Sequence, residues 1–259
     1  MNNRTDLKKR VIPIILINNY QVVTTRNFAD YRVFGNLEQT IEIFNRRDVD
    51  EIIVLDISCS KSKSLLDFNI LQLMSKNTLM PFSYGGGINS LNDIEKCLNL
   101  GCDKVSLNNI IRKDKNFLNM AVNEFGTQAI VVSIDYVLEN NIPFIYDHVS
   151  SKKLDEDFHD FLSFVHDQSC GEILLSSVNN NGFLKGYDLT VLKKYRDKID
   201  CPIITNGGCG SAQNMVDAFE GGSDACGAGS IFYYTKYGYK DIKDILREKK
   251  SKLDNIVEN

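Results

Sequence analysis

Two segments of this chain resemble buried strands that end in consecutive glycines, and they lie 121 positions apart. The first leads from Phe82 into Gly85-Gly86-Gly87, and the second leads from Ile203 into Gly207-Gly208. Glycines after a strand permit the tight turn and the close backbone approach that a bound phosphate needs. Two such turns at one interval indicate an internally duplicated chain with an anion site in each half.

The same interval recurs between other pairs of segments. Leu55-Asp56-Ile57-Ser58 is matched 120 positions later by Leu175-Ser176-Ser177-Val178. Asp103-Lys104-Val105-Ser106 is matched 121 positions later by Asp224-Ala225-Cys226-Gly227. Several matches in step are typical of a long internal repeat.

Short β-branched runs alternate with amphipathic stretches along the chain, which indicates parallel strands joined by helices. The runs are 11–17, 51–57, 80–84, 104–107, 129–135, 172–178, 202–205 and 225–228. The amphipathic stretches are 37–47, 91–100, 117–125, 155–168, 189–198 and 212–220. The length of 259 residues is close to the roughly 250 of an eight-fold barrel. We therefore predict one (βα)8 TIM-barrel domain over residues 1–259, with a two-fold half-barrel duplication. A doubly wound open sheet is the alternative, although it fits the repeat less well.

Composition excludes several classes of protein. A net charge of −4 and a pI near 5.5 argue against a nucleic-acid partner, and no apolar run is long enough to span a membrane. The polar start of the chain has no signal-peptide core. Seven cysteines without a C-x-x-C pair favour buried, reduced thiols and a cytoplasmic protein.

The three histidines, His148, His159 and His166, lack metal-ligand spacing with cysteine or aspartate. We expect neither a metal nor a cofactor. His159 and His166 fit the surface of a helix.

In a parallel barrel, ligand-binding residues follow the carboxyl ends of the strands. The first candidate phosphate site therefore comprises Gly86, Gly87, Ser106 and Asn108, and the second comprises Gly207, Gly208, Gly229 and Ser230. Turns after the last two barrel strands often bind phosphate. The alternative is that these glycines serve only the tight turns.

Several motifs carry a resemblance to one family. They include Val11-Ile12-Pro13, Tyr84-Gly85-Gly86-Gly87-Ile88, Ser133-Ile134-Asp135, Gly186-Tyr187-Asp188 and Asn206-Gly207-Gly208. Together they resemble the cyclase subunit of imidazole glycerol phosphate synthase, from about residue 8 to about residue 245. The resemblance implies a TIM barrel that binds a bis-phosphorylated ribotide. It also implies that a partner glutaminase delivers ammonia through the barrel.

The family's chemistry depends on two aspartates, which suit a reaction that needs a proton donor and a proton acceptor. Asp135 matches the aspartate of the fifth barrel strand, so the resemblance assigns it a catalytic role. The aspartate of the first strand is replaced by Leu16, the family's loop lysine by Thr24, and a further aspartate by Asn181. Leucine cannot transfer a proton, so cyclase chemistry by the family's usual route is in doubt.

The opposite end of the barrel retains the family's residue types. Arg10, Glu51, Lys104 and Glu172 match the charged ring that gates ammonia, and Asp103 matches a residue that meets the glutaminase. An alternating ring suits four charges that would be costly to bury unpaired. The alternative is an ordinary salt-bridged layer that serves stability alone.

A retained gate below an altered catalytic pair predicts a paralogue of the cyclase subunit. We expect a heterodimer with a glutaminase that feeds ammonia to the amidination of a surface-polysaccharide amino sugar, through a third protein, a sugar amidotransferase. The alternative is a working cyclase of histidine biosynthesis. A sugar-phosphate isomerase, which would act without a partner, and a pure scaffold fit the sequence less well.

Overall fold

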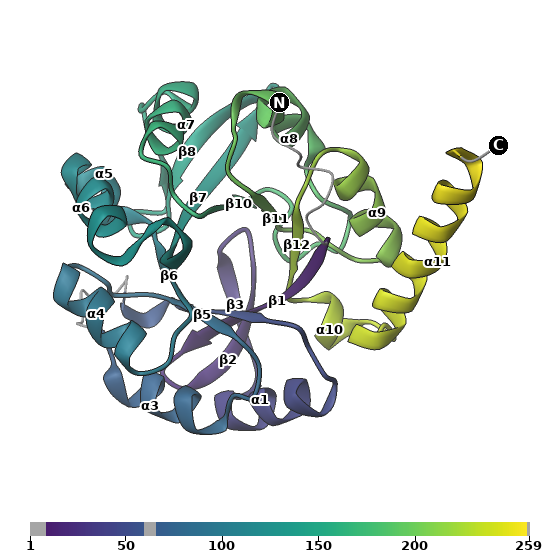
Figure 1. The fold of residues 1–259 in the computed structure, drawn as a ribbon, viewed down its shortest axis with the longest axis horizontal. Helices are drawn as coiled ribbons and strands as arrows, with labels where there is room; N and C mark the ends of the chain where they lie inside the picture. The colour runs from purple at the N-terminus through teal and green to yellow at the C-terminus, as the bar shows by residue number, and fades with distance from the viewer. Residues whose placement is uncertain (1–8, 60–65, 258–259) are drawn as a thin grey trace.

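A computed structural model describes residues 9–59 and 66–257, and in it a ring of parallel strands lies inside a ring of helices (Figure 1). The ring consists of β1 (Arg10–Asn18), β4 (Ile52–Asp56), β5 (Phe82–Gly85), β6 (Lys104–Leu107), β7 (Ile130–Glu139), β10 (Glu172–Ser177), β11 (Ile203–Asn206) and β12 (Ala225–Ala228). The last strand pairs in parallel with the first, from Arg10 opposite Ala225 to Pro13 opposite Ala228. The sheet therefore closes, which confirms the predicted (βα)8 barrel and excludes an open sheet.

Amphipathic helices connect the strands and cover the outside of the barrel (Figure 1). They are α1 (Leu37–Arg46), α3 (Phe68–Asn77), α4 (Leu91–Asn99), α6 (Lys115–Phe125), α7 (Phe158–Asp167), α8 (Leu189–Tyr195), α9 (Ala212–Glu220) and α11 (Tyr239–Val257). Shorter helices are α5 (Asn109–Lys113), α10 (Ile231–Tyr234) and the 3-10 turns η2 (Thr127–Ala129) and η3 (Arg196–Lys198). In the part of the chain that is described, no helix has the length and apolar character needed to cross a membrane.

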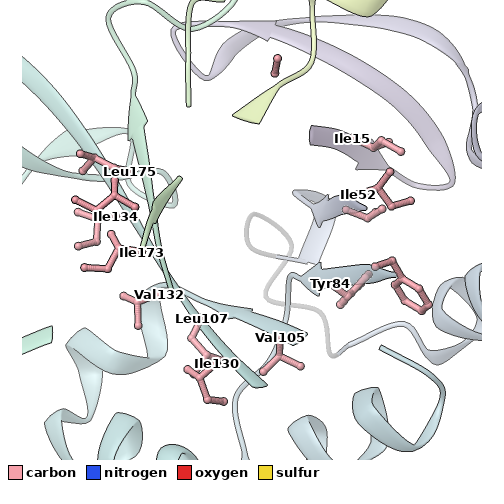
Figure 2. Packing of buried hydrophobic residues seen from close by; sticks show 14 of the residues in the cluster. Ile15, Ile52, Tyr84, Val105, Leu107, Ile130, Val132, Ile134, Ile173 and Leu175 are labelled. Carbon is pink, nitrogen blue, oxygen red and sulfur yellow. The ribbon is translucent and has the colours of Figure 1, made fainter. Parts of the chain in front are cut away.

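Side chains on the strands alternate between two apolar clusters, because successive strand residues point to opposite faces of the sheet. Ile130, Val132 and Ile134 of β7 belong to the large cluster between strands and helices, part of which Figure 2 shows. Val131 of the same strand belongs to a smaller cluster inside the barrel. The buried members of this inner cluster are Ile12, Ile14, Ile53, Val131, Leu174, Ile204 and Ala225.

The two halves of the barrel repeat their local contacts. Ser90 and Ser211, 121 positions apart, cap α4 and α9 by accepting the N–H three residues later. The carboxylate of Asp103 accepts the backbone N–H of Phe82 at 2.9 Å, and the carboxylate of Asp224 accepts that of Ile203 at 2.9 Å. These repeated contacts agree with the duplication that the sequence predicts.

Two hairpins were missed in the sequence, where only loops were expected. β2 (Gln21–Arg26) and β3 (Ala29–Asn36) follow β1, and β8 (Ile142–Asp147) and β9 (Lys152–Lys153) follow β7. β3 is exposed along most of its length, so it lacks the alternating apolar face that marks a strand. Each half of the barrel thus carries a hairpin after its first strand.

Candidate functional site

One cavity of about 440 Å³ opens at the carboxyl ends of the barrel strands. Its lining includes Asp135 and all the residues that the sequence suggests for phosphate, namely Gly86, Gly87, Ser106, Asn108, Gly207, Gly208, Gly229 and Ser230. The barrel therefore brings both glycine turns to one space, as the parallel strands require. The cavity floor includes Ile14, Ser133, Ser176, Asn206 and Gly227, whose side chains or backbone face the barrel interior.

Both glycine turns place the backbone where a side chain would not fit. Gly86 and Gly207 have φ angles of 134° and 94°, a region that L-residues rarely adopt. A Cβ at Gly207 would lie 2.5 Å from the carbonyl oxygen of Ser177, and a Cβ at Gly86 would collide with that of Asp56. Gly86 and Gly207 lie 121 positions apart, and so do the residues that they would meet, Asp56 and Ser177. The two turns are therefore structural equivalents.

Ser106 adds an unsatisfied polar atom to the first turn. Ser106 is 6% exposed and lines the cavity. Its buried hydroxyl has no hydrogen-bond partner among the described residues. Buried polar atoms are rarely left unpaired, so this hydroxyl is suited to a ligand atom.

Asp135 lies in the middle of the fifth barrel strand, β7, just before the segment that pairs with β8, and its side chain is buried in a polar cluster. Asn108 Nδ2 donates to Asp135 Oδ2 at 2.8 Å, and His148 Nδ1 lies 3.1 Å from the same oxygen. Asn109 Nδ2 lies 3.4 Å from the other ring nitrogen of His148. The sequence did not indicate this contact of His148, because the hairpin of β8 brings the imidazole back over β7.

The opposite wall of the cavity is apolar around Leu16. Leu16 pairs with Leu55 across the parallel ladder and with Val23 across the antiparallel one, and all three line the cavity. Asp56 is the other carboxylate that lines the cavity in the described part of the chain. Its oxygens accept hydrogen bonds from Ser58, Cys59 and Tyr84, so within residues 9–59 and 66–257 no carboxylate takes the place of Leu16.

A network of charged side chains closes the amino-terminal end of the barrel. Glu172 lies 2.8 Å from Arg10 Nη2 and 3.0 Å from Lys104 Nζ, and Glu51 lies 3.0 Å from Arg10 Nη1. We call these four residues the basal ring. Burial alone would lower the pKa of Arg10, but Glu172 and Glu51 outweigh it and raise that pKa. Burial also raises the pKa of Glu51, although Arg10 and Lys104 oppose the shift.

The inner apolar cluster separates the basal ring from the cavity. None of the four basal residues, nor Ile12, Val131 or Leu174, lines the upper cavity. These three apolar residues are fully buried. The expected ammonia passage between the two ends of the barrel stays a prediction.

Comparison with known proteins agrees with this arrangement. A family model described as "Histidine biosynthesis protein" matches residues 10–238. A Campylobacter jejuni protein provisionally named imidazole glycerol phosphate synthase subunit hisF2 is 40% identical over 240 residues, 93% of this chain and 96% of its own. A Vibrio vulnificus protein provisionally given the same name is 35% identical over 94% of this chain and 90% of its own. Imidazole glycerol phosphate synthase subunit HisF of Bacillus subtilis is 33% identical over 93% of this chain and 97% of its own.

The chain belongs to the HisF family of imidazole glycerol phosphate synthase subunits. The HisF resemblance seen in the sequence is thus confirmed at the level of the family.

Two further departures from the HisF pattern lie beside the apolar wall, and neutral hydrogen bonds occupy both positions. Thr24 shares a hydrogen bond of 2.7 Å with the hydroxyl of Tyr234, and Thr25 Oγ1 donates to Asn181 Oδ1 at 2.8 Å. The backbone N–H of Asn27 also donates to the carbonyl of Asn181. The two bonds of Asn181 fasten the β2–β3 hairpin to the loop after β10, and the bond of Thr24 fastens it to α10. Together they fix one rim of the cavity.

The other residues singled out in the sequence are Asp103, the cysteines, His159 and His166. Asp103 is exposed at the basal end, but its carboxylate also fixes the start of β5, so its match to the HisF pattern has a structural explanation besides a partner contact. All seven cysteines are free, six buried and Cys201 partly exposed. His159 and His166 lie on α7, His159 exposed and His166 partly so. Among the described residues no group of three or more potential ligands could hold a metal ion.

Proposed function

We propose that this chain is the barrel subunit of a glutamine amidotransferase complex that receives ammonia at its basal ring. A glutaminase would dock on the amino-terminal end and release ammonia there. The ammonia would react with a phosphate-bearing ligand held between the two glycine turns. The observation that carries this proposal is the paired basal ring beneath a cavity in which Leu16 stands where the HisF pattern has an aspartate.

The basal ring suits a gate because its charges are paired with one another. Arg10 and Lys104 share Glu172, so opening either ion pair leaves the other in place to hold the ring. Ammonia is small and uncharged, and an apolar layer above the ring would pass it more readily than it would pass an ion. Ammonium would therefore be held back while ammonia moves on.

The upper cavity suits an anionic ligand but lacks part of the acid–base machinery that closes an imidazole ring. Both glycine turns and the unpaired Ser106 hydroxyl support phosphate recognition at the two sides of the cavity. The apolar wall at Leu16 removes one of the two carboxylates on which imidazole closure depends. We infer that this ligand is a nucleotide-linked amino sugar of a surface polysaccharide, which is amidinated with a sugar amidotransferase as third partner.

Co-expression with a glutaminase of the imidazole glycerol phosphate synthase type tests the proposal. We expect a stable one-to-one complex that hydrolyses glutamine and forms no imidazole glycerol phosphate from the ribotide. A barrel that remains alone in gel filtration, or a complex that makes imidazole glycerol phosphate at the rate of a HisF enzyme, would reject it. Glu172→Gln should leave the complex intact while altering how much ammonia escapes to solvent.

A further inference from the structure

His148 is held against Asp135 by the second hairpin of the barrel. β8 pairs antiparallel with β7 from Glu139 opposite Ile142 to Tyr136 opposite Ile145, so the residue after β8 returns to the middle of β7. There Nδ1 of His148 lies 3.1 Å from Oδ2 of Asp135, and both side chains line the upper cavity. Asp135 is 6% exposed, so its carboxylate acts on the imidazole with little screening by water.

The contacts on the two ring nitrogens select one tautomer. A carboxylate only accepts hydrogen bonds, so Nδ1 of a neutral His148 must carry the proton. Asn109 Nδ2 only donates, and it lies 3.4 Å from Nε2, which must then offer its lone pair. At 3.4 Å this second contact is long, so a ligand can displace it.

The surroundings of Asp135 favour its role as a fixed partner. Asn108 Nδ2 donates to the same oxygen at 2.8 Å and holds the carboxylate in place. The neighbouring carboxylate of Asp147 is engaged elsewhere, because it accepts hydrogen bonds from Ser150 and lies 3.3 Å from Arg112. Asp135 is therefore the carboxylate that orients His148.

We propose that Nε2 of His148 is the proton acceptor of the upper cavity and that Asp135 is its positioning residue. Resting on the proposed function, the substrate class is a phosphate-bearing carbonyl compound attacked by ammonia. The new C–N bond forms as the carbonyl π electrons move to oxygen, and the nitrogen becomes positively charged. Nε2 takes one proton from that nitrogen and returns it to the oxygen, which leaves a neutral carbinolamine. Asp135 stabilises the imidazolium between the two transfers.

The tautomer of His148 provides a test that needs no ligand, ammonia or glutaminase. Two-dimensional ¹⁵N NMR of the isolated chain distinguishes a protonated Nδ1 from a protonated Nε2. We expect Nδ1–H in the wild type and its loss in Asp135→Ala. A protonated Nε2 in the wild-type protein overturns the proposal, whatever the behaviour of the variant.

Acylation by diethyl pyrocarbonate tests the availability of Nε2, with the other histidines as internal controls. We expect His148 to react faster than the exposed His159, and Asp135→Ala to slow it about tenfold, as loss of a charge-assisted hydrogen bond would. Asp200→Asn removes the carboxylate that lies 3.9 Å from His166 and should leave the rate at His148 unchanged. Asn109→Ala should not slow His148.

An unchanged rate at His148 in Asp135→Ala, or a lower rate in Asn109→Ala, would overturn the proposal. Rates at His159 that match the wild type show that each variant is folded, and rates at His166 show the same for Asp135→Ala and Asn109→Ala. Results that reject the role of His148 would not bear on whether a glutaminase complex forms. Absence of the complex would likewise not change the result expected for His148 in the isolated chain.

Discussion

Arg10 begins β1 and Glu172 begins β10, with β11 and β12 between these strands in the ring, and the two side chains meet with 2.8 Å between Nη2 and Oε1. Lys104 approaches the same Glu172 oxygen at 3.0 Å. The carboxylate of Glu172 thus pairs with two cations, which come from strands far apart in the sequence. This shared pairing holds the base of the barrel together.

Glu172→Ala should destabilise the protein by about 3 kcal/mol, because it leaves two partly buried cations facing each other. Glu42→Ala provides a matched control, since Glu42 pairs with Arg46 on the exposed face of α1. That variant should cost only about 0.3 kcal/mol. Urea unfolding at pH 7 measures both, and equal losses would show that the basal ring is no better paired than the surface.

Gly207→Ala should cost about 2–4 kcal/mol, because the backbone has a φ of 94° and the new methyl group would press on the carbonyl oxygen of Ser177. Gly35→Ala in β3 meets no atom within 4 Å and should change stability by less than about 0.5 kcal/mol. Thermal unfolding of the two variants checks the difference. A tolerated Gly207→Ala would argue against the described geometry of the turn.

The ionised carboxylate of Asp147 should stabilise the folded state, and this stabilisation should be lost as the pH falls from 3.8 to about 2. Burial opposes its ionisation, but hydrogen bonds from Ser150 and Val149 and the charge of Arg112 outweigh burial and lower its pKa from 3.8 to about 2. A lowered pKa means that the ionised group stabilises the folded state above the unfolded value and loses that effect as pH falls. The stability difference between wild type and Asp147→Asn should therefore be full at pH 5 and shrink between pH 3.8 and about 2. Urea midpoints across this range measure it, and a difference that grows on acidification would contradict the assignment.

Cys201 should be the first thiol to react with iodoacetamide in the native protein. Its contact with Cys170, at 3.9 Å between sulfur atoms, and the charge of Arg196 outweigh burial and lower its pKa. Burial raises the pKa of Cys209 to about 11, and Cys226 is fully buried. Peptide mapping after brief labelling should find Cys201 first, and Cys201→Ser should remove this early product. Early labelling of Cys209 instead would reject the prediction.

Much of the barrel could be predicted from the sequence, because buried parallel strands are short apolar runs bounded by turns. The ranges 104–107, 225–228 and 212–220 agree with β6, β12 and α9 at both ends. Helix α3 was missed, although its Ile70, Leu71 and Met74 are buried and have helical spacing. β3 could not be found from periodicity, since it buries almost no side chain.

The candidate site divides in the same way. The glycine turns were predicted because glycines follow two strands at a common interval. The basal ring was expected only because its four residues match the HisF pattern. The His148–Asp135 contact depends on the β7–β8 hairpin, and nothing in the spacing of the two residues indicates that they meet. The duplication could be predicted from the common interval, and the paired roles of Asp103 and Asp224 show it in detail.

The central claim is that the upper cavity keeps its phosphate turns but has lost half of its acid–base pair at Leu16. The most direct measurement supplies the isolated barrel with ammonium and the ribotide, and compares the wild type with Leu16→Asp. We predict that the wild type forms no imidazole glycerol phosphate and that Leu16→Asp forms it measurably. Turnover by the wild type would contradict the claim, as would a Leu16→Asp protein that is folded but neither binds the ribotide nor gains activity.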